Sequence, residues 1–403
     1  MEVCLAGTGG SDGWPQPGCG CASCARARAS GRTRAPARVV VDGVLRIGSG
    51  RPAPGYRERR LPGAWEVTAP DGGRLLVADG SGVTPEPPDG SRPYDIVLLD
   101  LLNDPAQLGA LRSRELVPAR AVVALLHADH RVSSEDELAR RCGFWGVLVP
   151  GDGDVLTAPA GAVSTSGEPA RPADTDPAHA VGPDPAHAVG PDPAHAASPD
   201  PAHAASPDPA ALPGPPRRVL VLGGARSGKS RHAELRLAAE PRVTYLAAGP
   251  FPPGTQPAGD SAWAERVAAH QSRRPRWWQT VESIDAAAVL RSESGAVLFD
   301  GAGTWLAAVM EQSGAWADGA EHTPGGPAAL AHIAEKADEL VEAWRRTRAR
   351  VVAVSDEVGS SVHPPTRAGL LFRDQLGWLN QRLAAESDET VLVVAGRPLT
   401  LPS

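Results

Sequence analysis

The run from Arg218 to Ser230 constrains the fold of this chain more than any other part of it. It reads RVLVLGGARSGKS, a short Val/Leu run followed by the pattern GxxxxGK[ST]. An apolar run without alternation is typical of a strand that is buried on both faces of a parallel sheet. The residues that follow Arg231 read HAELRLAAE and favour a helix. Strand, glycine-rich loop and helix in that order predict a phosphate-binding loop.

Each residue type in this loop has a physical role. Glycines let backbone N–H groups wrap around phosphates, and the amino end of the following helix adds its positive dipole. Lys229 is expected to reach the outer phosphates, and the Ser230 hydroxyl is expected to ligate Mg²⁺. Lys and Arg total 40, yet lysine stands only at Lys229 and Lys336. A chain that uses arginine almost everywhere keeps lysine where a compact ammonium is needed. The predicted nucleotide-binding residues of the loop are Gly223, Gly224, Ala225, Arg226, Ser227, Gly228, Lys229 and Ser230.

Further apolar runs of strand length alternate with helical patterns after the loop. The helical patterns cover Ala328 to Arg346 and Arg367 to Ala385. Strands that alternate with helices imply crossover connections and a mostly parallel sheet covered on both faces. We therefore predict an α/β nucleotide-binding domain over residues 217–403. Its predicted strands are Arg218–Leu222, Val243–Ala247, Ala296–Phe299, Val351–Val354 and Val391–Ala395.

A carboxylate that helps to hold Mg²⁺ is expected at the end of a second buried strand. Asp300 directly follows such a strand, and Asp356 and Glu357 follow another. Each of these carboxylates is also placed to cap a helix, because an acidic residue after a strand caps a helix about as often as it binds a metal.

A histidine near two arginines is the candidate nucleophile. His270 is followed by Arg273 and Arg274, and then by Trp277 and Trp278. A histidine beside guanidinium groups can attack a nucleotide phosphate while the arginines neutralise the transferred charge. On spacing alone, an ordinary surface histidine is the competing interpretation.

Five segments of the C-terminal half together resemble a known family. They are GGARSGKSRHAE from Gly223, RVAAHQSRRPRWWQTVE from Arg266, VLFDGAGTWL from Val297, SDEVGSSVHP from Ser355 and FRDQLGWLNQRLA from Phe372. In this order they resemble the bifunctional adenosylcobinamide kinase and adenosylcobinamide-phosphate guanylyltransferase of cobalamin biosynthesis. The resemblance covers residues 217–403.

The resemblance implies a RecA-like P-loop fold, a homotrimer and two successive reactions. First, ATP or GTP phosphorylates adenosylcobinamide. GTP then transfers its GMP moiety to His270, releasing pyrophosphate, and the GMP passes to adenosylcobinamide phosphate to give adenosylcobinamide-GDP. By the same resemblance Asp300 belongs to the metal and GTP site. The other implied nucleotide-binding residues are Ala247, Ala248, Gly249, Gln271, Ser272, Arg273, Arg274 and Glu282.

Some positions depart from the family pattern. The family usually has asparagine where this chain has Asp356, glycine where it has Ser361, and a glutamate where it has Ala262. A carboxylate in place of an amide adds negative charge near the phosphates, so nucleotide affinity or Mg²⁺ demand is expected to differ. None of these departures falls in the phosphate loop or at His270, so we expect an active enzyme. A nucleotide-binding regulatory protein that has lost transfer activity is the alternative.

An eight-residue repeat separates this domain from the first part of the chain. It begins as TDPAHAVG at Thr175 and recurs as PDPAHAVG and PDPAHAAS. Closely spaced prolines oppose helix formation, and alanine and valine offer too little surface for burial to offset the ordering entropy. We predict a disordered linker over residues 157–216.

The first 156 residues predict a smaller α/β or α+β domain. Its strand-like runs are Val39–Ile47, Leu75–Ala78, Ile96–Leu99 and Ala121–Leu126. The stretch from Gly7 to Arg28 resembles the opening of certain metallo-β-lactamase-fold phosphodiesterases. The HxHxDH motif of that fold is reduced here, because Leu125 stands in place of its first histidine. The resemblance therefore implies a degenerate, truncated relative, and a metal-free interaction or stabilising module is the alternative.

Cysteines crowd near the start of the chain. Cys19, Cys21 and Cys24 put three thiolates within reach of one Zn²⁺, with Cys4, Cys142 or a histidine as the fourth ligand. Five cysteines in this arrangement suit a reduced compartment better than a disulfide framework. A structural zinc site is therefore a hypothesis for the first domain.

The overall charge excludes some classes of function. A formal net charge of −7 without a long basic run argues against a dedicated nucleic-acid binder. No apolar stretch approaches the roughly 20 residues of a membrane span, and the N-terminus lacks the pattern of a signal peptide. We therefore predict a cytoplasmic protein.

Overall fold

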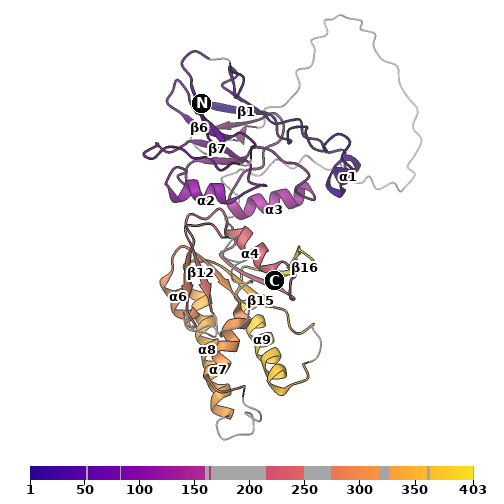
Figure 1. Ribbon diagram of the computed structural model, residues 1–403, viewed down its shortest axis with the longest axis vertical. Helices are drawn as coiled ribbons and strands as arrows, with labels where there is room; N and C mark the ends of the chain where they lie inside the picture. Colours follow the sequence, from indigo (N-terminus) through magenta and orange to yellow (C-terminus); the bar gives the residue numbers. More distant parts are fainter. Residues whose placement is uncertain are drawn as a thin grey trace, which may run out of the picture.

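The computed structural model divides into an N-terminal region and a C-terminal region (Figure 1). The structure describes residues 1–50, 53–81, 83–158, 163–164, 215–248, 274–316, 326–360 and 364–402. We call residues 1–158 with 163–164 the N-terminal region, and the described residues from 215 onward the C-terminal region. The predicted linker 157–216 lies almost entirely outside the described residues.

The N-terminal region is built on two five-stranded sheets, with strand orders β10-β9-β1-β2-β3 and β4-β5-β6-β7-β8. In the second sheet, β6, β7 and β8 run parallel to one another, while β4 and β5 are antiparallel. One hydrophobic cluster joins side chains of both sheets and of the helices. The mixed architecture predicted for this region is confirmed. The elements are β1 (Glu2–Gly7), α1 (Ala22–Ala29), β2 (Arg38–Val41), β3 (Leu45–Arg46), β4 (Arg57–Leu61), β5 (Ala64–Thr68), β6 (Arg74–Ala78), β7 (Ile96–Leu99), α2 (Ala106–Ser113), β8 (Val122–Leu125), α3 (Glu135–Trp145), β9 (Asp154–Thr157) and β10 (Val163–Ser164).

A seven-stranded sheet forms the C-terminal region, in the order β13-β12-β14-β15-β11-β16-β17. All neighbouring strands are parallel except the last pair, β16 and β17. This confirms the predicted α/β class with a mostly parallel sheet. The strands are β11 (Arg218–Gly223), β12 (Val243–Ala247), β13 (Gln279–Glu282), β14 (Ala296–Asp300), β15 (Arg350–Asp356), β16 (Glu389–Val394) and β17 (Arg397–Leu401). The helices are α4 (Lys229–Leu237), α6 (Ala286–Ser292), α7 (Ala302–Gln312), α8 (Gly326–Arg346) and α9 (Arg367–Ala385).

Helices cover both faces of this sheet. Leu220 and Leu222 point into a cluster with the apolar side chains of α6 to α9. Their neighbours Val219 and Val221 point into a second cluster, which includes Leu237 of α4. Because successive side chains of a strand face opposite ways, an apolar run of this kind is buried on both sides. The face covered by α4 is also the side on which the N-terminal region lies (Figure 1).

Among the described residues, no helix is both long enough and apolar enough to cross a membrane.

Candidate functional site

The phosphate loop lies between β11 and α4, at the carboxyl edge of the sheet. Arg226 and Gly228 adopt the left-handed backbone region, with φ of 57° and 96°. A Cβ on Gly223 would collide with the Ser227 side chain and would lie 2.8 Å from the Val393 carbonyl oxygen. The tight turn therefore requires glycine at positions 223 and 228. It leaves the first N–H groups of α4 directed at the loop, as a phosphate site needs.

Lys229 is held by a carboxylate of the neighbouring strand. Its Nζ lies 2.8 Å from Asp356 Oδ1 and donates a 3.3 Å hydrogen bond to the Gly224 carbonyl oxygen. The Lys229 side chain is 16% exposed and that of Asp356 is 45% exposed. Gly223 and Asp356 are register neighbours in the parallel pair β11–β15. The ammonium expected to reach phosphates is thus paired with Asp356 in this state of the protein.

Asp300 lies beside Ser230, at the end of the phosphate loop where α4 begins. The Ser230 hydroxyl donates to Asp300 Oδ1 at 3.2 Å, and the Tyr245 hydroxyl donates to Asp300 Oδ2 at 2.7 Å. Burial raises the pKa of Tyr245, and the Asp300 carboxylate raises it further. Tyr245 therefore stays protonated and keeps donating to Asp300. A serine hydroxyl next to an oriented carboxylate is the oxygen donor set that Mg²⁺ prefers.

The structure thus separates the three carboxylates that the sequence left as alternatives. Asp300 lies beside Ser230, whereas Asp356 contacts Lys229 instead. Glu357 accepts a hydrogen bond from the backbone N–H of Gly359 at 2.9 Å, which is a local turn contact. Asp300 is the carboxylate in position to act with Ser230.

Arg274 connects this carboxylate to the segment that follows His270. The Arg274 Cζ lies 3.1 Å from the centroid of the Tyr245 ring, and its NH1 donates to Thr280 Oγ1 at 3.4 Å. The Arg274 Nε is buried and has no hydrogen-bond partner. A guanidinium stacked on an aromatic ring keeps its charge while the ring fixes its position.

Other predicted site residues lie at the same edge of the sheet. Ala247 ends β12 and is the register neighbour of Glu282, which ends β13 and is exposed. Ala248 follows and is buried. Because β12 and β14 are adjacent parallel strands, these positions lie on the same side as Asp300. The predicted residues Gly249, His270, Gln271, Ser272 and Arg273 lie outside the described residues, as do Ala262 and Ser361.

The sequence of this chain also matches known proteins directly, over the part that contains Lys229, Ser230 and Asp300. Residues 219–401 match the family model of cobinamide kinase / cobinamide phosphate guanyltransferase. A bifunctional adenosylcobalamin biosynthesis protein, CobP of Pseudomonas aeruginosa, is 36% identical over 190 residues, which are 46% of this chain and 96% of the relative. The chain belongs to the cobinamide kinase / cobinamide phosphate guanyltransferase family.

Two further relatives in this family agree. The bifunctional adenosylcobalamin biosynthesis protein CobU of Salmonella typhimurium is 36% identical over 185 residues, covering 44% of this chain and 96% of the relative. The protein of the same name in Escherichia coli is 35% identical over 199 residues, which cover 44% of this chain and 96% of that relative. The family predicted from the motifs is confirmed.

A solved structure of an ATPase from a bacterial type III secretion system is similar with a TM-score of 0.26 and 12% identity. The similar part covers 44% of this chain and 51% of the ATPase chain. A likeness of this size has no bearing on the family assignment.

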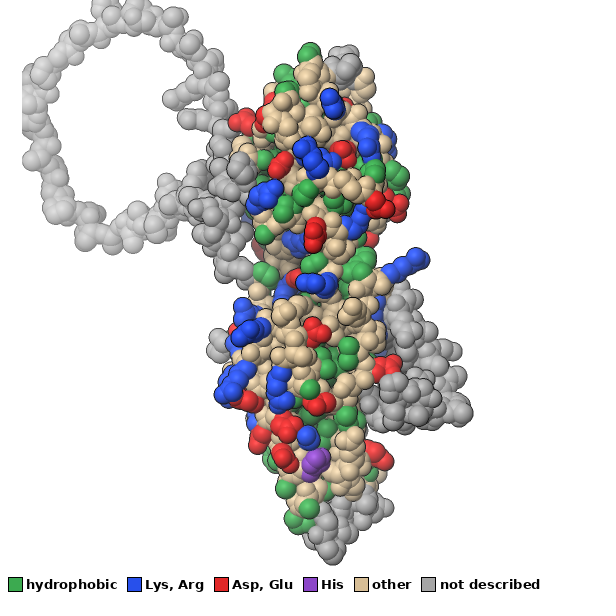
Figure 2. All heavy atoms as spheres, turned by 90° about the vertical axis from the view of Figure 1, so that its left-hand side faces the viewer, with side chains coloured by type: hydrophobic (Ala, Val, Ile, Leu, Met, Phe, Trp, Pro, Cys, Tyr) green, Lys and Arg blue, Asp and Glu red, His purple; other side chains and the backbone are tan. Residues whose placement is uncertain are grey.

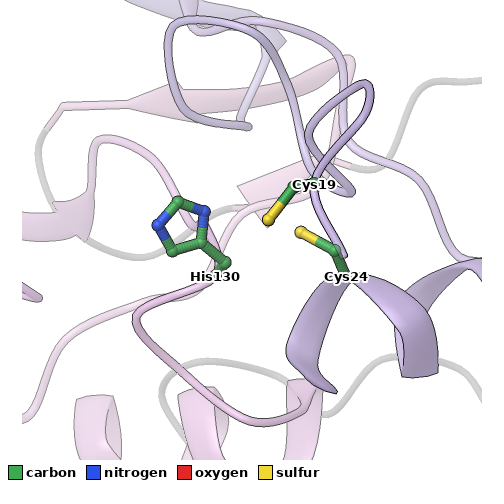
Figure 3. Close-up of side chains that lie close together, drawn as sticks. All are labelled: Cys19, Cys24 and His130. Carbon is green, nitrogen blue, oxygen red and sulfur yellow. The ribbon is translucent and has the colours of Figure 1, made fainter. Parts of the chain in front are cut away.

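The family match begins at residue 219 and does not extend to the cysteines near the N-terminus. Figure 3 shows the sulfurs of Cys19 and Cys24 pointing toward one another, with the His130 ring beside them. One ligand atom from each of these three residues lies within 4.8 Å of the others, and this is the one such cluster among the described residues. Backbone bridges between Gly9 and Ala128 bring the two segments together.

Cys21 sits at the edge of this cluster. Its sulfur caps α1 by accepting from the Cys24 backbone N–H at 3.4 Å. That hydrogen bond, followed by contacts with the Cys19 side chain, lowers the pKa of the Cys21 thiol, whereas burial raises the pKa of Cys24. Cys142 is buried in α3 and burial raises its pKa to about 12. The structure therefore favours a histidine, His130, among the fourth ligands that the sequence left open.

A cavity of about 590 Å³ lies at the carboxyl ends of β6, β7 and β8. Asp100 and His127 line it, and Arg131 donates to both Asp100 oxygens at 2.9 and 3.1 Å. Arg131 also contacts Asp129 at 2.8 Å and His127 Nε2 at 3.0 Å. These polar groups satisfy one another around an arginine. Of the segment compared above with HxHxDH, only His130 joins the metal-type cluster found among the described residues.

Sequence reasoning missed two contributors to the nucleotide site. Tyr245 lies within an apolar run and reads as an ordinary core residue. The contact between Asp356 and Lys229 depends on the adjacency of β11 and β15, which are far apart along the chain. An acidic residue directly after the VVAVS strand was the available signal for Asp356.

Proposed function

We propose that this chain phosphorylates adenosylcobinamide and then transfers GMP from GTP to adenosylcobinamide phosphate. The family match over residues 219–401 supports both activities. The observation that carries the proposal is the placement of Lys229, Ser230 and Asp300 around one phosphate loop. In the kinase step a substrate hydroxyl oxygen bonds to the γ-phosphorus and its proton passes to solvent. The bond from that phosphorus to the β-phosphate oxygen breaks, and the nucleoside diphosphate leaves. Lys229 and the loop N–H groups stabilise the charge that develops on the phosphate oxygens.

In the second step His270 is the proposed nucleophile. One of its ring nitrogens bonds to the α-phosphorus of GTP, and pyrophosphate leaves. A phosphate oxygen of adenosylcobinamide phosphate then bonds to the same phosphorus and releases His270. Splitting the transfer this way avoids a direct reaction between two bulky anions. Arg274, fixed on the Tyr245 ring, contributes positive charge near this segment.

Mg²⁺ is proposed to bind at Ser230 and Asp300, where it would neutralise phosphate charge. The two side chains already lie 3.2 Å apart and both offer oxygen. Asp300 keeps its orientation through the Tyr245 hydroxyl whether or not the ion is bound. The other nucleotide contacts implied by the family resemblance are part of the same proposal.

The test is incubation of the full chain with GTP labelled at the α-phosphate. Wild type is expected to carry acid-labile, base-stable label, and His270→Ala is expected to carry none. His332→Ala is the matched control, because His332 is a half-buried histidine on α8 that lies 3.9 Å from Glu335. Label that persists in His270→Ala refutes the nucleophile. Bound GTP without label in the wild type favours the alternative, a regulatory nucleotide-binding protein.

We further propose a structural Zn²⁺ held by Cys19, Cys21, Cys24 and His130. Three thiolates and one imidazole form a closed tetrahedral set of the kind found in structural zinc sites. The closeness of the Cys19, Cys24 and His130 ligand atoms supports it. Elemental analysis of the purified full chain is expected to give one zinc per chain, and His130→Ala is expected to lose it on mild chelation. A wild-type chain that is folded and free of zinc contradicts the proposal.

Three broader expectations stay predictions. The division into domains 1–156 and 217–403 joined by a linker is testable by limited proteolysis. The trimer implied by the family resemblance is testable by light scattering, and the cytoplasmic location by cell fractionation. The metallo-β-lactamase resemblance of residues 1–156 remains a hypothesis about ancestry.

A further inference from the structure

Two side chains of the N-terminal region donate to carbonyl groups at the carboxyl end of the P-loop helix, one in its last turn and one two residues beyond it. The indole Nε1 of Trp145 donates to the Leu235 carbonyl oxygen at 2.8 Å, and Arg112 NH1 donates to the Ala239 carbonyl oxygen at 3.0 Å. The final carbonyl groups of a helix have no partner within the helix, and they carry partial negative charge. A guanidinium and an indole N–H at this end of α4 therefore complement it in both hydrogen bonding and charge.

Phe144 forms a second contact with the same helix. The Arg236 Cζ lies 4.2 Å from the centroid of the Phe144 ring, and the His232 ring meets that ring edge-on at 5.7 Å. Arg350 of β15 donates through NH2 to the Phe144 carbonyl oxygen at 2.9 Å. Arg236 is 1% exposed and pairs with Glu389 of β16. The two terminal nitrogens of this buried guanidinium reach the Glu389 carboxylate, while the Phe144 ring covers its face.

Backbone approaches backbone at Gly109 of α2. A Cβ at this position would lie 2.7 Å from the Ala238 carbonyl oxygen and 3.0 Å from that of Glu240. Ala239 is 2% exposed and belongs to the hydrophobic cluster of the N-terminal region. The close approach therefore depends on the absence of a side chain at Gly109.

In the space-filling view of Figure 2, the upper and lower parts of the molecule touch without a visible gap between them. The contact consists of directional interactions centred on the carboxyl end of α4 and the residues that follow it, with Arg350 of β15 beside them. Helix α4 begins at Lys229, so its amino end lies at the phosphate loop and its carboxyl end lies at this contact. The proposed reactions use residues of the C-terminal region and assign no role to the N-terminal region.

We propose that the N-terminal region binds the C-terminal region of the same chain through the carboxyl end of α4, and that it thereby caps the P-loop helix. Its partner is the phosphate-binding half of this same chain. The contact holds the two halves together without help from the peptide link between them, and it keeps the last turn of α4 ordered.

The test cuts the chain between the two regions after folding. A protease recognition sequence is placed in the octapeptide repeats, at residues 175–206, and the purified full chain is cleaved and run on a size-exclusion column. The cleaved wild type is expected to elute as one complex that contains both fragments. Gly109→Ala is expected to release two separate fragments. Alanine is the better helix former, so Gly109→Ala keeps its helix content by circular dichroism.

Gly143→Ala is the matched control. Gly143 lies in α3, is exposed, and has no atom within 4 Å of a built Cβ. Its cleaved fragments are expected to stay together like those of the wild type. The proposal is overturned if cleaved wild type separates, or if cleaved Gly109→Ala stays associated to the same dilution as Gly143→Ala.

A second pair of variants covers the case in which Gly109→Ala fails to fold. Arg112→Met removes the donor to Ala239 and is expected to weaken the association of the cleaved halves about ten-fold. Arg59→Met is its control, since Arg59 is an exposed arginine of β4. Equal association of these two variants contradicts the capping contact.

Discussion

The pairing of Lys229 with Asp356 predicts the effect of one substitution on nucleotide binding. Lys229 Nζ is 2.8 Å from Asp356 Oδ1, so an incoming triphosphate competes with this carboxylate for the ammonium. Asp356 also places a negative charge beside the loop that is proposed to bind the phosphates. Asp356→Asn removes both effects while keeping the size of the side chain. We expect it to bind nucleoside triphosphate more tightly than the wild type does.

The magnitude follows from the exposure of the pair. Asp356 is 45% exposed, so solvent screens its charge and a deep-interior dielectric constant does not apply. Exposed ion pairs contribute at most about 1 kcal/mol, and a unit charge about 4 Å away in water contributes about 1 kcal/mol. We therefore expect a gain of about 1 kcal/mol, which is about a five-fold lower dissociation constant. The gain is expected to shrink as salt is added.

The assay is calorimetric titration of the full chain with a non-hydrolysable GTP analogue, at low and at high salt. Asp338→Asn is the control, because Asp338 is an exposed carboxylate of α8 that pairs with Arg382. Its affinity is expected to match that of the wild type. An Asp356→Asn chain that binds as the wild type does, or more weakly, refutes the reasoning, since a weaker variant would mean that the carboxylate assists binding.

Three other substitutions test the structure. Gly223→Ala is expected to abolish nucleotide binding in the same titration, because the added Cβ meets Ser227 and the Val393 carbonyl oxygen; retained affinity contradicts the tight turn. Tyr245→Phe removes the hydrogen bond to Asp300 and is expected to reduce the free energy of unfolding by about 1–2 kcal/mol and to weaken Mg²⁺-dependent nucleotide binding. Tyr56→Phe loses a comparable bond to Asp42 and should spare nucleotide binding, so equal binding losses in both variants contradict the assignment. Burial lowers the pKa of His232 from 6.5 to about 3, helped by the charge of Arg236. The unfolded chain therefore binds more protons in this range, and stability is lost as pH falls from 6.5 toward about 3, by up to about 5 kcal/mol in total. Urea unfolding across that range should show a smaller loss for His232→Asn than for wild type, and an unchanged acid dependence refutes the assignment.

The central strands of the C-terminal sheet were predictable because they are buried on both faces. Such strands read as continuous apolar runs, and β11, β12, β14, β15 and β16 all lie where the sequence predicts them, with small shifts at their ends. The edge strands were missed. β13 reads QTVE and is mostly exposed, and β17 contains Pro398, so neither carries an apolar run.

The N-terminal region was harder to predict for a related reason. β4 reads RERRL and is mostly exposed, so its sequence resembles a loop. The single run predicted over Val39–Ile47 is a hairpin of β2 and β3, because Asp42 and Gly43 turn with φ of 48° and 70°. The Asp-Gly pair between the two apolar stretches is a sequence signal for a two-residue hairpin turn, and a prediction that attended only to the apolar residues missed it.

The candidate sites show the same limit. Lys229, Ser230 and Asp300 were predictable because a loop motif and a strand end mark them locally. The approach of His130 to Cys19 depends on how two distant segments pair, and spacing along the chain contains no record of it.

The stack of Arg274 on Tyr245 links the position of one guanidinium to the orientation of Asp300. Arg274 lies a few positions after His270 in the chain, and Tyr245 donates to the carboxylate that the Ser230 hydroxyl also contacts. Removal of the Arg274 guanidinium would leave the Tyr245 ring, and with it the hydroxyl that donates to Asp300, without this stacking contact. A substitution at Arg274 is therefore expected to affect the orientation of Asp300 as well as the local charge.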